Sequence, residues 1–435
     1  MGKQKVSNAL FIVWAGGAAL VSYALVYALR KPFTAATFEG LEFLGMDYKT
    51  ATSIVQIAGY VLSKLLGIKL VSELQRRHRL PFLIGSVAMA ELSLLAFGLL
   101  PVPWNIVALF FNGLSLGCMW GVIFSYLEGR RLSGVLASVM GMSIACSSAL
   151  AKSAGLYLIR DLGVDPFWMP AIIGGVAFVL LVVLAFALNA LPDPSAEDRA
   201  ACAERVPMDG RQRRQIFLRF APLLTMLFAA NLFVTVIRDI KEDFLVNIVD
   251  TSQLSAWAFS GVDAVVTAII LLLFLAVSLI RSHLNVLCTL LVLVLVSMFA
   301  LVYVAWNYDW LALSPLAWLF VQSLGVYTAF LSFQTLFFER FVACYHIRGN
   351  VGFFIVTIDF IGYVGTVGVL VFKELFAGEL DWLAFYNSMV VWLGLASCLL
   401  FAGSLLWLAR GRSLTLGGGW KRRVAVWEEP DTVTA

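Results

Sequence analysis

Two tyrosines and an arginine share one face of a predicted helix near the start of the chain. The stretch YALVYALRKPFT (residues 23–34) places Tyr23, Tyr27 and Arg30 at positions i, i+4 and i+7, and a helix brings these positions to the same side. That side presents two hydroxyl groups and one guanidinium. Because a guanidinium donates two parallel hydrogen bonds to a carboxylate or a phosphate, the pattern indicates binding of an oxyanion.

A second face of this kind occurs near the middle of the chain. Asn231 and Arg238 in NLFVTVIR are seven residues apart and lie on one side of a predicted helix. Both arginines stand in apolar stretches, where a charge at the centre of a membrane helix costs ~2.5–3.5 kcal/mol and usually faces a cavity or a partner. Two interpretations follow. Either Arg30 and Arg238 bind an anion between them, which we favour, or Arg30 pairs permanently with a carboxylate such as Asp359 or Asp263.

The stretches around these residues indicate an integral membrane protein. Of the 435 residues, 61% are hydrophobic and only 13% are charged, about half the charged share of a soluble domain, and the mean hydropathy is +0.90. Helices satisfy their own backbone hydrogen bonds in lipid, so we predict an all-α membrane fold. The predicted spans are residues 9–36, 50–73, 81–100, 103–126, 134–158, 166–191, 216–247, 252–280, 285–306, 312–338, 349–374 and 381–409.

The longest polar stretch divides these twelve predicted helices equally. We expect a six-helix half over residues 1–191, a cytoplasmic linker over 192–215, a second six-helix half over 216–410 and a flexible cytoplasmic tail over 411–435. This is the outline of a transporter whose halves are related by an axis along the membrane normal. Such an axis would bring the first and seventh helices, and with them Arg30 and Arg238, toward each other.

The distribution of basic residues predicts the orientation. With both termini in the cytoplasm, twenty Lys and Arg residues lie on the cytoplasmic side and only Lys49, Arg160 and Lys373 lie on the other. Basic residues concentrate in cytoplasmic loops, so we predict a multi-pass protein of the plasma or inner membrane. Among the remaining basic residues, Lys64 and Lys152 lie inside spans, whereas Lys69 and Lys241 are expected to reach the membrane surface with their long side chains.

Several of these motifs resemble those of one transporter family. YALVYALRKPF resembles the first-helix motif of the organophosphate:phosphate antiporters of the major facilitator superfamily, which has two tyrosines and Arg-Lys-x-Phe at the same offsets. GYVLSKLL (residues 59–66) resembles the family's second helix and places Lys64 at its cavity lysine. ANLFVTVIRDIKEDF (residues 230–244) resembles helix seven and aligns Asn231, Arg238 and Asp243.

The resemblance continues through the second half of the chain. SAWAFSGVDAV (residues 255–265) places Asp263 where the family has a cavity glutamate, and TLFFER contains Glu339. FIGYVG (residues 360–365) matches the family at Tyr363, and Tyr327 corresponds more loosely. The resemblance covers nearly the whole chain. It implies a major facilitator fold of about twelve transmembrane helices in two six-helix halves, alternating access, and transport of phosphorylated solutes in exchange for phosphate.

The chain also departs from the family pattern. The family's helix-five histidine aligns near Ser143, and no histidine lies in any predicted span. Lys152 either supplies the missing positive charge or pairs with a carboxylate. The superfamily's cytoplasmic loop motif is degraded to GIKLVSELQRRHR (residues 67–79), with Glu73 in place of the aspartate and Arg76 and Arg77 as the basic pair. We expect an altered gate rather than a lost one.

The sequence therefore predicts a secondary active transporter of a small anionic solute, an organophosphate, phosphate or carboxylate, held between arginines of helices one and seven. Alternatives are a non-transporting membrane anion sensor of the same fold and, less favoured, an enzyme acting on lipid-borne phosphate. We expect a monomer in the lipid bilayer that exchanges phosphate or couples to a proton or ion, with no enzyme activity, cofactor, metal site or nucleic-acid partner.

The predicted substrate-binding residues are Arg30, Arg238, Tyr23, Tyr27, Lys64, Asn231, Asp263, Tyr363, Lys152, Ser143 and Tyr327. The predicted gating or coupling residues are Glu73, Arg76, Arg77, Asp359 and Glu339.

Overall fold

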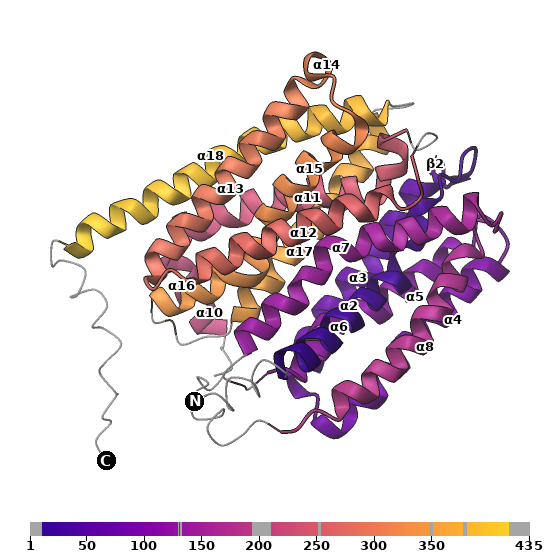
Figure 1. The fold of residues 1–435 in the computed structure, drawn as a ribbon, viewed down its shortest axis with the longest axis horizontal. Helices are drawn as coiled ribbons and strands as arrows, with labels where there is room; N and C mark the ends of the chain where they lie inside the picture. Colours follow the sequence, from indigo (N-terminus) through magenta and orange to yellow (C-terminus); the bar gives the residue numbers. More distant parts are fainter. Residues whose placement is uncertain are drawn as a thin grey trace.

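A computed structural model gives the fold of the chain (Figure 1). It describes residues 11–128, 130, 133–193, 210–250, 254–345, 347, 351–376 and 381–416. Most of the predicted linker, residues 194–209, and most of the predicted tail, residues 417–435, lie outside the described residues.

The first part of the chain forms helices and one short hairpin. These elements are η1 (Ile12–Gly16, a π-helix), α2 (Gly17–Arg30), η2 (Pro32–Ala35, a 3-10 helix), β1 (Glu42–Phe43), β2 (Met46–Asp47), α3 (Tyr48–Glu73), α4 (Arg76–Leu99), α5 (Ile106–Leu116), α6 (Met119–Ser125), α7 (Ser133–Arg160) and α8 (Met169–Asn189). Strands β1 and β2 pair antiparallel, with Glu42 opposite Asp47.

The second part is helical throughout its described residues. Its elements are α10 (Gly210–Arg219), α11 (Ala221–Ile248), α12 (Ala258–Ser278), α13 (His283–Trp306), α14 (Tyr308–Leu311), α15 (Pro315–Leu331), η3 (Ser332–Phe337, a π-helix), α16 (Phe338–Cys344), α17 (Val351–Phe376) and α18 (Trp382–Leu416). Two boundaries differ from the prediction. Helix α10 begins inside the polar stretch expected to be a linker, and α18 runs six residues past residue 410, where a flexible tail was expected to follow.

Prolines and a capping serine determine where several helices begin and end. Helix α2 stops at Arg30, two residues before Pro32, because a proline has no amide hydrogen with which to continue the helical hydrogen bonds. Pro222 and Pro315 stand in the first turns of α11 and α15. The amide hydrogens of a first turn have no partner within the helix, so a proline there costs no helical hydrogen bond. Ser314 caps α15 with its side chain. The end of α2 thus places Arg30 where the chain turns out of the helix.

The predicted spans correspond to helices of the structure. Eleven helices among the described residues are long and apolar enough to cross a membrane. Helix α3, with 26 residues, takes the place of the second predicted span. It is less apolar because it contains Lys49, Gln56 and Lys64 together with several serines and threonines. These helices make the chain an integral, multi-pass membrane protein.

The helices form two groups that meet along a central contact. In Figure 1 the helices of residues 12–189 (indigo to magenta) lie on one side and those of residues 210–416 (pink to yellow) lie on the other. Helix α7 packs against α12, and α3 packs against α17, so these pairs join the two groups. Within the groups, α3 packs on α5 and α11 packs on α18.

Glycines allow α3 and α5 to approach until their backbones touch. A Cβ atom built on Gly59 would lie 2.1 Å from the carbonyl oxygen of Phe110, and one built on Gly113 would lie 2.2 Å from that of Gln56. Small residues of this kind let membrane helices pack closely. Close packing matters in lipid because no hydrophobic force draws the helices together there. Any larger side chain at either position would push the two helices apart.

We therefore expect Gly113→Val to destabilise the protein by about 1–3 kcal/mol, the usual cost of overpacking a well-packed contact. The measurement is the melting temperature of the purified protein in detergent. Gly85→Ala is the matched control, because a Cβ atom at Gly85 meets nothing within 4 Å. Equal losses of melting temperature in the two variants would contradict the assignment of this contact to the glycines.

Candidate functional site

Twelve charged side chains gather where the two groups of helices meet. We call this set the central charge cluster; its members are Arg30, Lys31, Lys49, Lys64, Lys152, Arg238, Asp239, Lys241, Glu242, Asp243, Asp263 and Asp359. All except Lys64 are buried, and the side chain of Lys64 is 14% exposed. The cluster holds seven cations and five carboxylates. With every group in its ordinary ionised form, it has an excess of two positive charges.

Arg30 is a buried cation of this cluster that rests on aromatic rings. Its Cζ atom lies 3.7 Å from the ring centroid of Tyr60 and 5.9 Å from that of Tyr363. Its Nε atom has no hydrogen-bond partner among the described residues. The ion pairs of this region belong to Lys31, Lys64 and Arg238. Within the described part of the chain, Arg30 is therefore held by cation–π contact rather than by a carboxylate.

Arg238 differs from Arg30 because it has carboxylate partners. Its Nε and Nη2 atoms donate to Asp239 Oδ1 at 3.0 and 2.6 Å, and Nε lies 3.9 Å from Glu242 Oε1. Arg238 is thus an ion-paired guanidinium in this structure. Its Cζ atom lies 5.9 Å from the ring centroid of Tyr363, the same distance as that of Arg30. The two guanidiniums are therefore at most twice this distance apart, with Tyr363 beside both.

Lys31 and Lys152 connect the first group of helices to α11. Lys31 Nζ forms an ion pair with Asp243 Oδ1 and lies 3.9 Å from Glu242 Oε2. Lys152 Nζ, from α7, donates to the backbone carbonyl of Glu242. Among the described residues, Lys152 therefore bonds to a carbonyl and not to a carboxylate. Glu242 receives contacts from several elements at once, because Tyr327 of α15 also donates to its Oε1 at 3.0 Å.

A second connection between the groups runs from α3 to α17. Lys64 Nζ forms an ion pair with Asp359 Oδ2, and Gln334 of the π-helix η3 donates to Asp359 Oδ1. Asp263 Oδ2 lies 3.4 Å from the hydroxyl of Tyr327. Asp359 and Asp263 thus have partners other than Arg30. The alternative in which Arg30 pairs permanently with one of them does not describe this structure.

The remaining predicted binding residues are also buried. The rings of Tyr23 and Tyr27 are 5.6 Å apart, and Tyr23 also contacts Trp120. Asn231 donates from Nδ2 to Thr235 Oγ1 at 3.3 Å, while its Oδ1 has no partner among the described residues. Ser143 donates to the carbonyl of Met140 in its own helix at 2.6 Å. Because its hydroxyl is bonded within α7, Ser143 offers little in place of the expected histidine.

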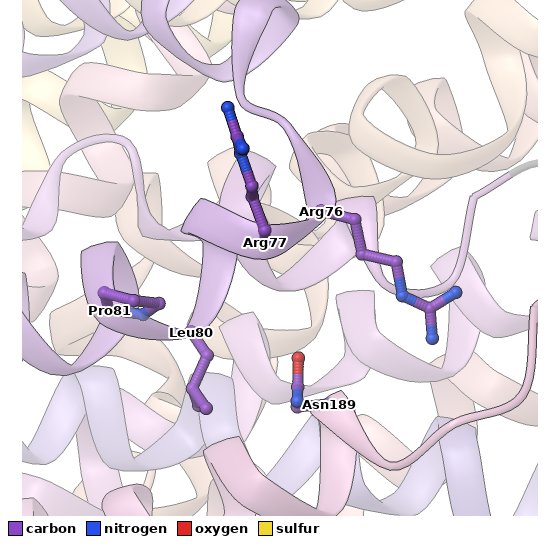
Figure 2. A pocket seen from close by; sticks show the side chains of 5 residues that line it. All are labelled: Arg76, Arg77, Leu80, Pro81 and Asn189. Carbon is purple, nitrogen blue, oxygen red and sulfur yellow. The ribbon is translucent and has the colours of Figure 1, made fainter.

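Of the predicted gating or coupling residues, Asp359 belongs to the central charge cluster, whereas Arg76, Arg77 and Glu339 lie outside it. Arg76 forms an ion pair with Asp193 and donates to the carbonyl of Leu191 at 2.8 Å, so its partners follow α8 in the same group of helices. Arg76 and Arg77 extend in different directions from the start of α4 beside a surface hollow of about 600 Å³ (Figure 2). Glu339 is exposed, and the side chain of Glu73 lies outside the described residues.

Several members of the site were not selected from the sequence. Lys31 follows Arg30 directly, Tyr60 stands four residues before Lys64, and Glu242 stands four residues after Arg238. Helical spacing to a selected residue was the signal that could have found Tyr60 and Glu242. The prediction that Lys241 reaches the membrane surface is wrong. Its side chain is buried and donates to Ser323 Oγ at 2.7 Å.

Comparison with known proteins identifies a family and a fold. A family model described as "Family of unknown function (DUF5690)" matches residues 32–411. No curated protein matches the sequence.

Three solved structures align over almost the whole chain. A D-xylose-proton symporter aligns with a TM-score of 0.60 and 12% identity, covering 90% of this chain and 96% of that one. The nucleoside transporter NupG aligns with a TM-score of 0.58 and 13% identity, covering 91% and 99%. The xylose transporter XylE from E. coli, partially occluded and inward-open, aligns with a TM-score of 0.59 and 11% identity, covering 89% and 98%.

The predicted fold is confirmed by these alignments. The three transporters have the major facilitator fold, and the chain shares it. At this level of identity the likeness concerns the fold alone. The narrower resemblance to organophosphate antiporters is not confirmed by them.

The ion pair between Lys64 and Asp359 gives a prediction about stability. Asp359→Asn leaves Lys64 without its carboxylate, and breaking a buried pair in this way costs about 3 kcal/mol. The double variant Lys64→Gln with Asp359→Asn removes both charges and should melt at a higher temperature than Asp359→Asn alone. Asp309→Asn, at an exposed position, is the control. A double variant that melts lower than either single variant would contradict the pairing.

Proposed function

We propose that this chain, which belongs to the DUF5690 family, is a secondary transporter that carries a small anionic solute by alternating access. The observation that carries the proposal is Arg30. It is a guanidinium buried among membrane helices, and within the described residues it has an orphan Nε atom and no ion pair. A buried charge without a partner is costly, so its retention favours a mobile anion as the partner.

The charge of the central cluster supports an anionic solute. Its cations outnumber its carboxylates, so a bound anion would reduce the excess of positive charge. Phosphate monoesters and dicarboxylates are anions near neutral pH, and phosphate suits a guanidinium fork. We infer that a phosphorylated solute is the first choice, in keeping with the motifs shared with organophosphate antiporters. A carboxylate is the second.

The proposed binding site lies between the two groups of helices. Arg30, Tyr60 and Tyr363 would hold the anionic group, while Asn231 and Asp263 would meet hydroxyl groups of the solute. Asn231 supports this role because one of its amide atoms has no partner among the described residues. Rocking of the two six-helix halves about this site would expose it to each side in turn. We place both termini in the cytoplasm, on the distribution of Lys and Arg.

The first experiment is a thermal-shift screen of the purified protein with phosphate, sugar phosphates, glycerol phosphates and dicarboxylates. A ligand that binds only the folded state raises the melting temperature by mass action. We expect Arg30→Lys to weaken the best ligand by about tenfold or more, because a lysine cannot reproduce a bidentate charged hydrogen bond. Arg281→Lys, at an exposed position, is the matched control and should bind as the wild type does.

Uptake of the best ligand into proteoliposomes then separates transport from sensing. Accumulated label in wild-type vesicles, reduced in the Arg30 variant, is the expected result. Thermal protection without flux would favour the anion sensor. Identical thermal shifts for wild type, Arg30→Lys and Arg30→Ala would show that Arg30 does not bind the anion, and the proposed function would fail.

A further inference from the structure

Glu242 occupies a position that suits the transported anion. Its Oε1 atom lies 3.9 Å from Arg238 Nε and accepts a hydrogen bond from Tyr327 at 3.0 Å, and its Oε2 atom lies 3.9 Å from Lys31 Nζ. These donors come from α11, from α15 and from the end of α2. A carboxylate surrounded by a guanidinium, an ammonium and a phenol from three elements has the surroundings expected of a bound oxyanion.

The groups around Glu242 are mostly positive. Lys152 of α7 donates to its backbone carbonyl, and Lys241 and Tyr27 also lie within electrostatic reach. The carboxylates that act on it are Asp239 of α11 and Asp263 of α12, and Asp243 shares Lys31 with it. Asp239 is engaged by Arg238 and Thr366, and Asp243 is engaged by Lys31. Glu242 is thus a second carboxylate for both Arg238 and Lys31, and it lies 3.9 Å from each, farther than Asp239 and Asp243 do.

The contacts of Glu242 are looser than those of its neighbours. Arg238 donates to Asp239 at 2.6 Å but stands 3.9 Å from Glu242, and Lys31 pairs more closely with Asp243 than with Glu242. A carboxylate held at 3.9 Å contributes charge without occupying the hydrogen-bonding positions of either cation. It is therefore the member of this group that an incoming anion would displace with the smallest loss of hydrogen bonds.

We propose that Glu242 is an internal counter-anion that competes with the transported anion for Arg238 and Lys31. This inference rests on the proposed function and deepens it. When the solute is absent, Glu242 offsets part of the positive charge that the cluster holds around Arg238 and Lys31. When the solute binds, its negative charge lies beside Glu242 and the two repel each other. The affinity for the transported anion therefore depends on how strongly Glu242 competes with it for Arg238 and Lys31.

This competition has a consequence for the mode of transport. An unloaded site with uncompensated cations resists closing, because closing removes those charges from water. Such a carrier returns only when loaded, and it can therefore only exchange. Glu242 keeps the excess of the unloaded cluster at two positive charges rather than three, which lowers the cost of closing, and the cation–π contact with Tyr60 supports Arg30. We therefore assign to this chain the ability to return empty, which permits net transport in addition to exchange.

The test compares two uptake modes for labelled inorganic phosphate, the head group common to phosphorylated solutes. Exchange is measured in proteoliposomes preloaded with phosphate, and net uptake is measured in vesicles without it. We expect wild type to show both modes. Glu242→Gln should retain exchange and lose net uptake at least about tenfold, because its unloaded site lacks a counter-charge. Glu42→Gln, at an exposed position of β1, makes the same chemical change elsewhere and should behave as wild type.

Binding in detergent supplies a readout that a purely structural role would not give. Removal of a competing charge 3.9 Å from Arg238 should make Glu242→Gln bind phosphate about tenfold more tightly. Phosphate should also raise its melting temperature more than that of wild type, even where the variant is less stable. Glu242→Asp keeps the charge and should retain net uptake.

The outcomes distinguish the inference from the proposed function. Exchange without net uptake by wild type, or weaker phosphate binding by Glu242→Gln, would overturn the inference and leave the transporter in place. No uptake by wild type in either mode would overturn the proposed function for phosphate compounds, and the inference with it.

Discussion

The burial of more cations than carboxylates is the constraint on which the structure of this protein depends. Membrane helices must bury their charges against partners, because an uncompensated charge in lipid is costly. The two groups of helices meet this requirement by facing their charged sides toward each other. Lys31 and Lys152 reach α11, and Lys64 reaches Asp359 on α17. The same contacts that hide these charges from lipid therefore hold the two groups together.

Aromatic rings provide the second level of organisation. Tyr60 lies under Arg30, Phe330 lies under Arg238, and Tyr363 stands beside both guanidiniums. A ring face attracts a cation without occupying its hydrogen-bond donors. The guanidiniums are therefore held in place while some of their N–H groups stay free for a ligand. Packing and binding are thus served by different parts of the same side chain.

The sequence predicted the helices well and the site only in part. Apolar runs of span length are a strong local signal, so the order of the helices and the fold class followed from it. That Arg30 and Arg238 lie toward each other followed from their spacing along the helices and from the expected symmetry of the two halves. The partners of the arginines were harder to predict, because Asp239 and Glu242 lie on α11 together with Arg238 and the sequence does not show which groups of other helices they face. The prediction for Lys241 is wrong for the same reason. Charge pairing across two groups of helices is a tertiary property that spacing along one helix does not contain.

Helix α3 touches the second group of helices at two widely separated points. Lys49 donates to Asn247 of α11 at 2.6 Å, and Lys64 pairs with Asp359 of α17. The two lysines are fifteen positions apart, which corresponds to roughly 22 Å of helix. Helix α3 is fixed to α5 by backbone contact at Gly59 and Gly113, so the two helices form one rigid unit. A tilt of α3 about its middle would open its contact with the second group at one end while the contact at the other end stays closed.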